Sequence, residues 1–137
     1  MKINVGNGRV LDLRFRREDV VRVDKEFAWV AVSGCGDKDV VENGEKSVRT
    51  TCSLSEVLDV NGKGKENYKQ ITSASVVCNP KEHNDKRKGF KYALAKVFSV
   101  PCTVSAEERE AIWNAFLMTW YPEILASKLA KNGPSHN

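Results

Sequence analysis

The sequence predicts an α+β domain, in which an antiparallel sheet of about four strands precedes two to three C-terminal helices. Strand-like patterns fill the N-terminal part of the chain and helical patterns the C-terminal part, and the two kinds do not alternate. This segregation is typical of α+β folds. The 137 residues, 41% hydrophobic and 29% charged, suit one domain with its own core. We expect that domain to span residues 1–132, with a disordered tail over 133–137.

Four segments have the composition and the two-residue period of half-buried strands. The predicted strands are residues 8–23, 26–32, 48–57 and 71–78. In the first, Leu11 and Leu13 alternate with charged residues, and in the second, Phe27 and Trp29 share one face. Polar stretches that contain glycine separate the later strands, which predicts loops at residues 33–46 and 61–67.

Helical patterns begin near residue 85. Phe90, Leu94 and Val97 recur at helical spacing and place one apolar stripe on a helix that Pro101 ends. Residues 105–108, Ser-Ala-Glu-Glu, have the S-x-x-E pattern of a capping box, which marks the start of a second helix. That helix is apolar on almost every side, which indicates burial on more than one side, against its own sheet and a second subunit. A short third helix is predicted over residues 123–131.

The motifs that the sequence lacks disfavour several classes of protein. No apolar segment approaches the ~18 residues of a membrane-spanning helix. No apolar N-terminal segment resembles a signal peptide, so we expect a cytoplasmic protein. The four cysteines are scattered without a C-x-x-C pair, which favours free thiols over a zinc site. Only His83 and His136 are available as a base for a nucleophilic cysteine, so we predict no enzyme, no cofactor and no metal site.

The most informative segment is the basic run from Lys81 to Lys96. Its cations crowd the first turns of the predicted helix, where the helix dipole disfavours them. Together with the free amides of a helix start, they suit a phosphate or pyrophosphate group. The alternative is an ordinary solvated basic face, which we weigh about equally. Gly89 fits close packing or the approach of a ligand, and Phe90 fits the core better than a base-stacking platform.

Two motifs carry a family resemblance. The first is N-P-K-x-x-N-x-K-R-x-G-x-K-x-A-L-x-K, from residue 79, and the second is E-R-x-A-I-W-x-A-F, from residue 108. With strands before them, they resemble a group of small phage proteins, the phage Thoeris anti-defence sponge proteins of the first type. The motif segments cover residues 79–98 and 105–116, and the sheet matches in pattern only. The residues that match together are Gly89, Lys91, Ala93, Leu94, Lys96, Arg109, Ile112 and Trp113.

The resemblance implies a phage anti-defence protein that acts without catalysis. Such proteins sequester cyclic ADP-ribose-type signals made by bacterial TIR proteins, and some also hold cyclic oligonucleotides. It further implies a homo-oligomer, a dimer or a trimer of dimers, in the cytoplasm of the infected bacterial host. The cations then expected at the pyrophosphate are Arg87, Lys88, Lys91 and Arg109, with Asn84 supplying an amide. Phe90 or Trp113 is expected to stack on a base, and Arg49 is a weaker candidate on a strand.

Other functions remain as alternatives. The small size and the aromatic C-terminal helix fit a protein–protein inhibitor of a defence complex, of the anti-CRISPR type. The net charge of +4 and a second basic cluster fit a small nucleic-acid-binding accessory protein. An enzyme that acts on a nucleotide ranks lowest. The second basic cluster is predicted on the solvent face of the first strand and consists of Arg14, Arg16, Arg17 and Arg22.

Overall fold

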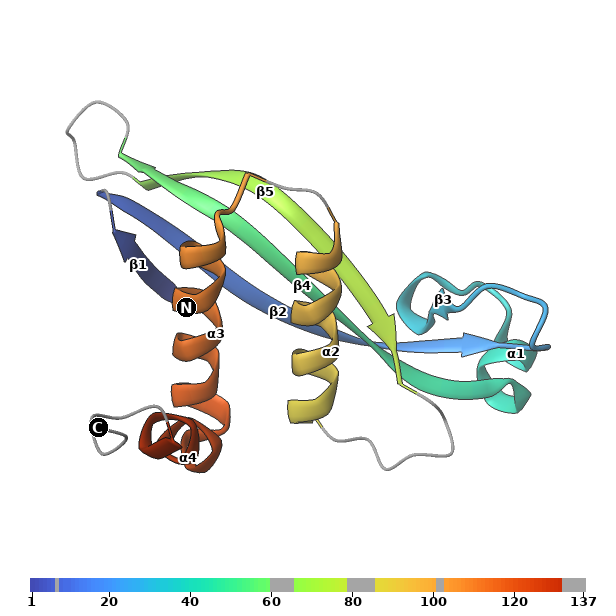
Figure 1. Ribbon diagram of the computed structural model, residues 1–137. Helices are drawn as coiled ribbons and strands as arrows, with labels where there is room; N and C mark the ends of the chain where they lie inside the picture. Colours follow the sequence, from blue (N-terminus) through green and yellow to red (C-terminus); the bar gives the residue numbers. More distant parts are fainter. Residues whose placement is uncertain (7, 60–65, 79–85, 101–102, 132–137) are drawn as a thin grey trace.

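The computed structural model describes residues 1–6, 8–59, 66–78, 86–100 and 103–131. It confirms the α+β architecture, with a five-stranded antiparallel sheet before the C-terminal helices (Figure 1). The strands are β1 (Lys2–Gly6), β2 (Arg9–Arg22), β3 (Val30–Ala31), β4 (Glu45–Asp59) and β5 (Glu66–Val77). The helices are the short 3-10 helix η1 (Val32–Gly34), α1 (Lys38–Asn43), α2 (Lys86–Ser99), α3 (Ala106–Trp120) and α4 (Pro122–Lys131). The predicted tail, residues 133–137, lies outside the described residues.

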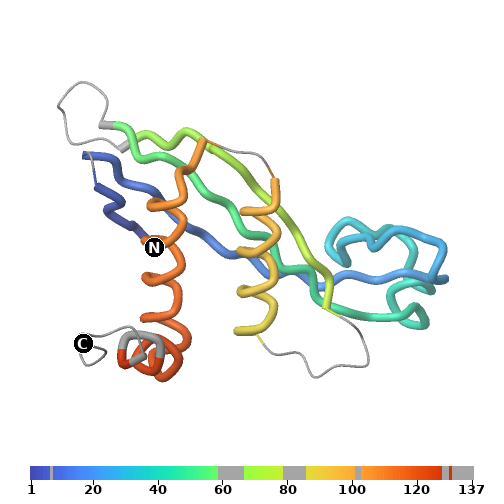
Figure 2. The backbone as a smooth tube through the Cα atoms, viewed as in Figure 1, coloured from blue at the N-terminus to red at the C-terminus, as the bar shows by residue number. Residues whose placement is uncertain are grey.

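The strand order is β1–β2–β4–β5, and β3 pairs with the far end of β2. The register of β2 and β4 pairs Leu13 with Leu54 and Phe15 with Cys52. Because side chains alternate between the two faces of a strand, this register puts the apolar residues of both strands on one face. Figure 2 shows β2 and β4 continuing beyond α2 to a far end, where α1 and β3 lie.

The predicted strand over residues 26–32 is wrong except at its end. Only Val30 and Ala31 pair with β2, and the side chain of Phe27 is 63% exposed. The amide of Phe27 donates to the carbonyl of Asp24 at 3.0 Å, so the chain turns here instead of extending. The β-branched and aromatic composition was a weak signal, because strand formation depends on an available partner edge.

Three further elements were missed by the sequence patterns. Residues Lys2–Gly6 form the edge strand β1, where Ile3 is buried; five residues gave too short an alternation to detect. The segment predicted as a loop over residues 33–46 contains η1 and α1. Asp37 caps α1, since its side chain accepts hydrogen bonds from the amides of Asp39 and Val40.

The core lies between the sheet and the C-terminal helices. The ring of Phe15 on β2 stacks on Phe90 of α2, with 4.3 Å between centroids, and lies 5.8 Å from Phe116 of α3. Both helices therefore cover the same face of the sheet, and they touch each other through Phe98 and Trp113. Figure 1 shows that α2, α3 and α4 leave the opposite face open.

The start of α3 confirms the predicted capping box. The hydroxyl of Ser105 accepts the amide N–H of Glu108, and the Glu108 carboxylate accepts the amide N–H of Ser105. The predicted third helix is also present as α4, which begins at Pro122. In the part of the chain that the structure describes, no helix has the length and apolar character needed to cross a membrane.

Candidate functional site

The first turns of α2 carry a dense group of cations. Lys86, Arg87, Lys88 and Lys91, here called the α2 patch, fall within six residues and are all exposed. The first turn of this helix contains no acidic residue. The start of α2 thus holds the helical part of the predicted basic run except Lys96, which is in the last turn and donates to the carbonyl of Ser75 at 2.8 Å. Asn84 lies outside the described residues.

Two of these cations have partners at the end of α3. The Arg87 guanidinium lies 4.9 Å from the ring centroid of Tyr121 and donates to the carbonyl of Trp120 at 3.4 Å. The Lys86 ammonium lies 5.3 Å from the ring centroid of Trp120. Carbonyls at the C-terminal end of a helix attract cations, so α3 offsets part of the cost of placing charges at the start of α2. This tertiary benefit was invisible in the sequence.

The other two cations of the α2 patch, Lys88 and Lys91, have no such partners on α3 among the described residues. Lys88 and Lys91 make no ion pair or hydrogen bond with the described residues. They are three positions apart on the helix, where like charges repel each other. A bound anion would relieve this repulsion. Lys88 and Lys91 are therefore the members of the α2 patch best suited to meet a ligand.

Gly89 serves the packing of α2 against the sheet. It is buried, and a Cβ atom at this position would lie 2.8 Å from Oγ1 of Thr50 on β4. Side chains do not tolerate so close an approach, so only glycine lets the helix lie this near the strand. Of the two roles that the sequence left open for Gly89, the geometry supports close packing.

The predicted base-stacking rings belong to the aromatic core. Phe90 is only 4% exposed and is covered by Phe15 and Trp120. Trp113 is half-buried and packs between Phe98 and Phe116, with centroids 5.8 and 5.9 Å away. Phe90 lies beside the α2 patch, with the Lys86 ammonium 5.5 Å from its ring centroid, but the ring is too deeply buried to stack on a base. Among the described residues, the ring contacts of Trp113 are to Phe98 and Phe116 and not to the α2 patch.

The two predicted arginines outside α2 lie elsewhere. Arg109 is on the first turn of α3, at the opposite end of the helical layer from the start of α2 (Figure 1). Its Nε is buried and has no hydrogen-bond partner among the described residues. Arg49 sits on β4, where it donates to the carbonyl of Trp29 at 2.7 Å and to Glu18 at 3.1 Å. Of the eight predicted site residues, Arg87, Lys88 and Lys91 share one surface.

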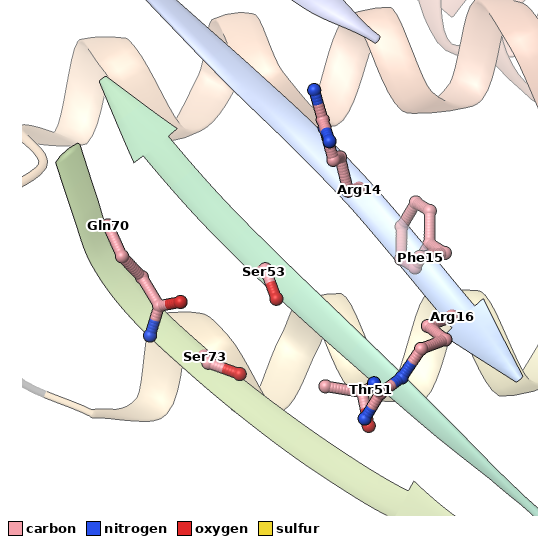
Figure 3. A pocket seen from close by; sticks show the side chains of 7 residues that line it. All are labelled: Arg14, Phe15, Arg16, Thr51, Ser53, Gln70 and Ser73. Atoms are coloured by element: carbon pink, nitrogen blue, oxygen red, sulfur yellow. The ribbon is translucent and has the colours of Figure 1, made fainter. Parts of the chain in front are cut away.

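A second candidate region was missed by the sequence analysis. A hollow of about 430 Å³ lies on the open face of the sheet. The alternation in β2 and β4 already placed Arg16 and Thr51 away from the core, but only the strand register puts them opposite each other. Figure 3 shows the residues of three strands that line this hollow: Arg14, Phe15, Arg16, Thr51, Ser53, Gln70 and Ser73.

Groups suited to covalent chemistry are scarce among the described residues. Burial raises the pKa of the Cys52 thiol to about 12, so this cysteine is protonated at neutral pH and is a poor nucleophile. Cys35 and Cys78 are half-buried free thiols, whereas Cys102, His83 and His136 lie outside the described residues. No group of three or more Cys, Asp or Glu side chains in the described ranges is placed to hold a metal ion.

Comparisons with protein-family models, with curated proteins and with solved structures each returned no match. The class to which the chain belongs is thus defined by its own architecture. It is an α+β protein with helices on one face of an antiparallel sheet and cations at the start of the helix that follows the sheet.

Proposed function

We propose that this protein binds and sequesters a cyclic nucleotide signal of the cyclic ADP-ribose type without cleaving it. In this proposal it acts as a phage anti-defence protein in the cytoplasm of the infected bacterial host, as the family resemblance implies. The observation that carries the proposal is the α2 patch, in particular the exposed charges of Lys88 and Lys91, which pair with no residue that the structure describes.

The chemistry of the patch suits a pyrophosphate. Two ammonium groups without carboxylate partners among the described residues supply charge-assisted hydrogen bonds to phosphate oxygens. Amides at a helix start and the positive end of its dipole favour the same anion. Sequestration needs affinity only, so the proposal assigns no general base and no nucleophile to this surface.

The test is calorimetric titration with cyclic ADP-ribose isomers and cyclic oligonucleotides. Lys91→Glu places a negative charge in the α2 patch, and we expect it to weaken capture by about a hundredfold or more, since attraction becomes repulsion. Arg87→Glu is expected to do the same. Lys91→Glu is the cleaner variant, because Arg87 also holds the end of α3.

Lys38→Glu is the matched control. Lys38 is exposed on α1, at the far end of the sheet, and its replacement changes the net charge by the same amount. It should leave capture unchanged, while thermal unfolding confirms that each variant folds. If Lys91→Glu binds as tightly as the wild type, the ligand does not bind at the α2 patch. Absence of heat with every ligand would overturn the proposed function.

A further inference from the structure

The hollow on the open face of the sheet has a simple structural origin. The register of β4 and β5 places Ser53 directly opposite Ser73, and Thr51 opposite Ser75. Small side chains therefore fill the middle of this face. Arg16 on β2 is directly opposite Thr51 in the strand register, so a longer side chain stands beside these small ones. In Figure 3 the Arg16 side chain extends across the sheet toward Thr51. The result is a depression with a cationic wall.

Charge pairing along the open face singles out one cation. Three arginines on this part of the molecule have carboxylate partners: Arg14 with Asp12, Arg49 with Glu18 and Arg22 with Glu45. Arg16 makes no ion pair or hydrogen bond with any described residue and is exposed. The hollow therefore presents one uncompensated guanidinium, which suits a single phosphate group better than a chain of phosphates.

Neutral donors complete the surroundings of that guanidinium. The hydroxyls of Ser53 and Ser73 and the amide of Gln70 line the hollow and make no hydrogen bond with the described residues. Arg14 also lines the hollow, and its planar guanidinium lies 5.0 Å from the ring centroid of Tyr68, which is outside the lining. Hydroxyls and a guanidinium suit phosphate oxygens, and an amide with a flat surface suits the edge and face of a base.

We propose that this hollow binds one nucleoside monophosphate. Arg16 and the two serine hydroxyls hold the phosphate, and Gln70 with the planar guanidinium of Arg14 contacts the base. The volume of about 430 Å³ falls within the range of about 300–1,000 Å³ that is usual for small-molecule sites. This site is on the face of the sheet opposite to α2 and does not rest on the proposed function of the α2 patch.

The experiment is titration of the wild type with the four ribonucleoside 5′-monophosphates, followed by variants. Arg16→Gln is expected to weaken binding by about tenfold or more, because it removes the only unpaired cation among the described residues that line the hollow. Ser53→Tyr, which fills the hollow from the centre of the sheet, is expected to abolish it. Arg17→Gln is the matched control, since strand alternation puts this neighbour on the other face, and its affinity should stay within about twofold of the wild type.

The other probes decide between sources of the phosphate. Inorganic phosphate that binds as tightly as the nucleotides would overturn the assignment of the base contacts. A single-stranded oligonucleotide that binds more tightly, with a steep dependence on salt, would overturn the small-molecule site in favour of a nucleic-acid surface. Wild-type affinity in both Arg16→Gln and Ser53→Tyr, or no binding of any monophosphate, would also overturn it.

The same variants separate this site from the α2 patch. Lys91→Glu should leave monophosphate binding intact, and Arg16→Gln should leave capture of cyclic ADP-ribose isomers intact. Loss of both activities in either single variant, with the fold preserved, would show that the hollow is not an independent site.

Discussion

The contact between Gly89 and Thr50 sets the distance between α2 and the sheet. Gly89 is buried inside a helix, where glycine normally costs about 1 kcal/mol relative to alanine. Thr50 is fully buried, and its Oγ1 has no hydrogen-bond partner among the described residues. A costly glycine thus faces an unsatisfied hydroxyl, so the close packing of α2 on β4 must offset both costs.

We expect Gly89→Ala to lower the free energy of unfolding by about 1–3 kcal/mol. The added Cβ would lie 2.8 Å from Thr50 Oγ1, and overpacking of this kind outweighs the gain in helix propensity. Denaturant unfolding of Gly89→Ala, Thr50→Ala and the double variant measures the coupling. The double variant should recover much of the loss, because Thr50→Ala removes the clashing atom. Equal stability of Gly89→Ala and the wild type would disprove the packing role.

The neighbours of Phe90 in the sequence were not enough to assign this residue to the core or to a ligand site. Beside a glycine and several lysines, Phe90 fits the core better than a ligand platform by sequence, but the platform stays open as an alternative. Its stacking on Phe15, which is 75 positions earlier in the chain, assigns it to the core. A long-range contact of this kind leaves no local signal.

At the scale of elements, the start of α3 is tied to the sheet by one arginine. Arg9 on β2 donates to Glu108 at 3.0 Å and to Glu56 on β4 at 2.7 Å. Glu108 is also the acidic member of the capping box. The hydrogen bond from the Ser105 amide, together with the charge of Arg9, lowers the pKa of the Glu108 carboxyl. The Glu108 carboxylate therefore caps the start of α3 and, through Arg9, links this helix to β2 and β4.

Glu108→Ala is expected to lower the free energy of unfolding by about 1–2 kcal/mol at neutral pH, as loss of a cap does. Because the pKa of Glu108 is lower in the folded state, its contribution is complete above the unfolded pKa of about 4.3. The contribution is lost as the pH falls through the folded value. Unfolding of variant and wild type at about pH 7 and about pH 2 should show the difference shrinking.

Glu107→Ala provides the comparison for this prediction. Glu107 is exposed in the same turn of α3 and lacks the contacts of Glu108 with Ser105 and Arg9. Its replacement should change stability by less than about 0.5 kcal/mol, as is usual for surface positions. A stability difference for Glu108→Ala that persists unchanged in acid would show that its carboxylate charge is not the stabilising feature.

On the scale of the whole molecule, the helical layer leaves apolar surface at its outer side. Met118 on α3 is 67% exposed, although the sequence predicted burial of this helix on more than one side. The family resemblance implies a homo-oligomer, in which a second subunit would cover such a surface. The structure of one chain accounts for the burial of Ile112 and Phe116 but not for the exposure of Met118.

If the oligomer forms through α3, light scattering of the wild type should give at least twice the mass of one chain. Met118→Glu should shift the mass toward the single chain, since a buried charge disfavours an apolar interface. Ala95→Glu, at an exposed position of α2, should leave the mass unchanged. A wild type that is monomeric at micromolar concentration would contradict the oligomer.

Local sequence patterns were sufficient to predict the α+β class, the two long central strands, the capped start of α3 and the basic start of α2. All of these depend on local periodicity, capping chemistry or charge, which neighbouring residues reveal. The three-dimensional arrangement was needed to establish that Gly89 serves packing, that Phe90 and Trp113 lie among core rings and that Arg16 stands opposite Thr51. These outcomes depend on strand register and helix placement, which bring distant residues together and therefore leave no trace in any short stretch of sequence.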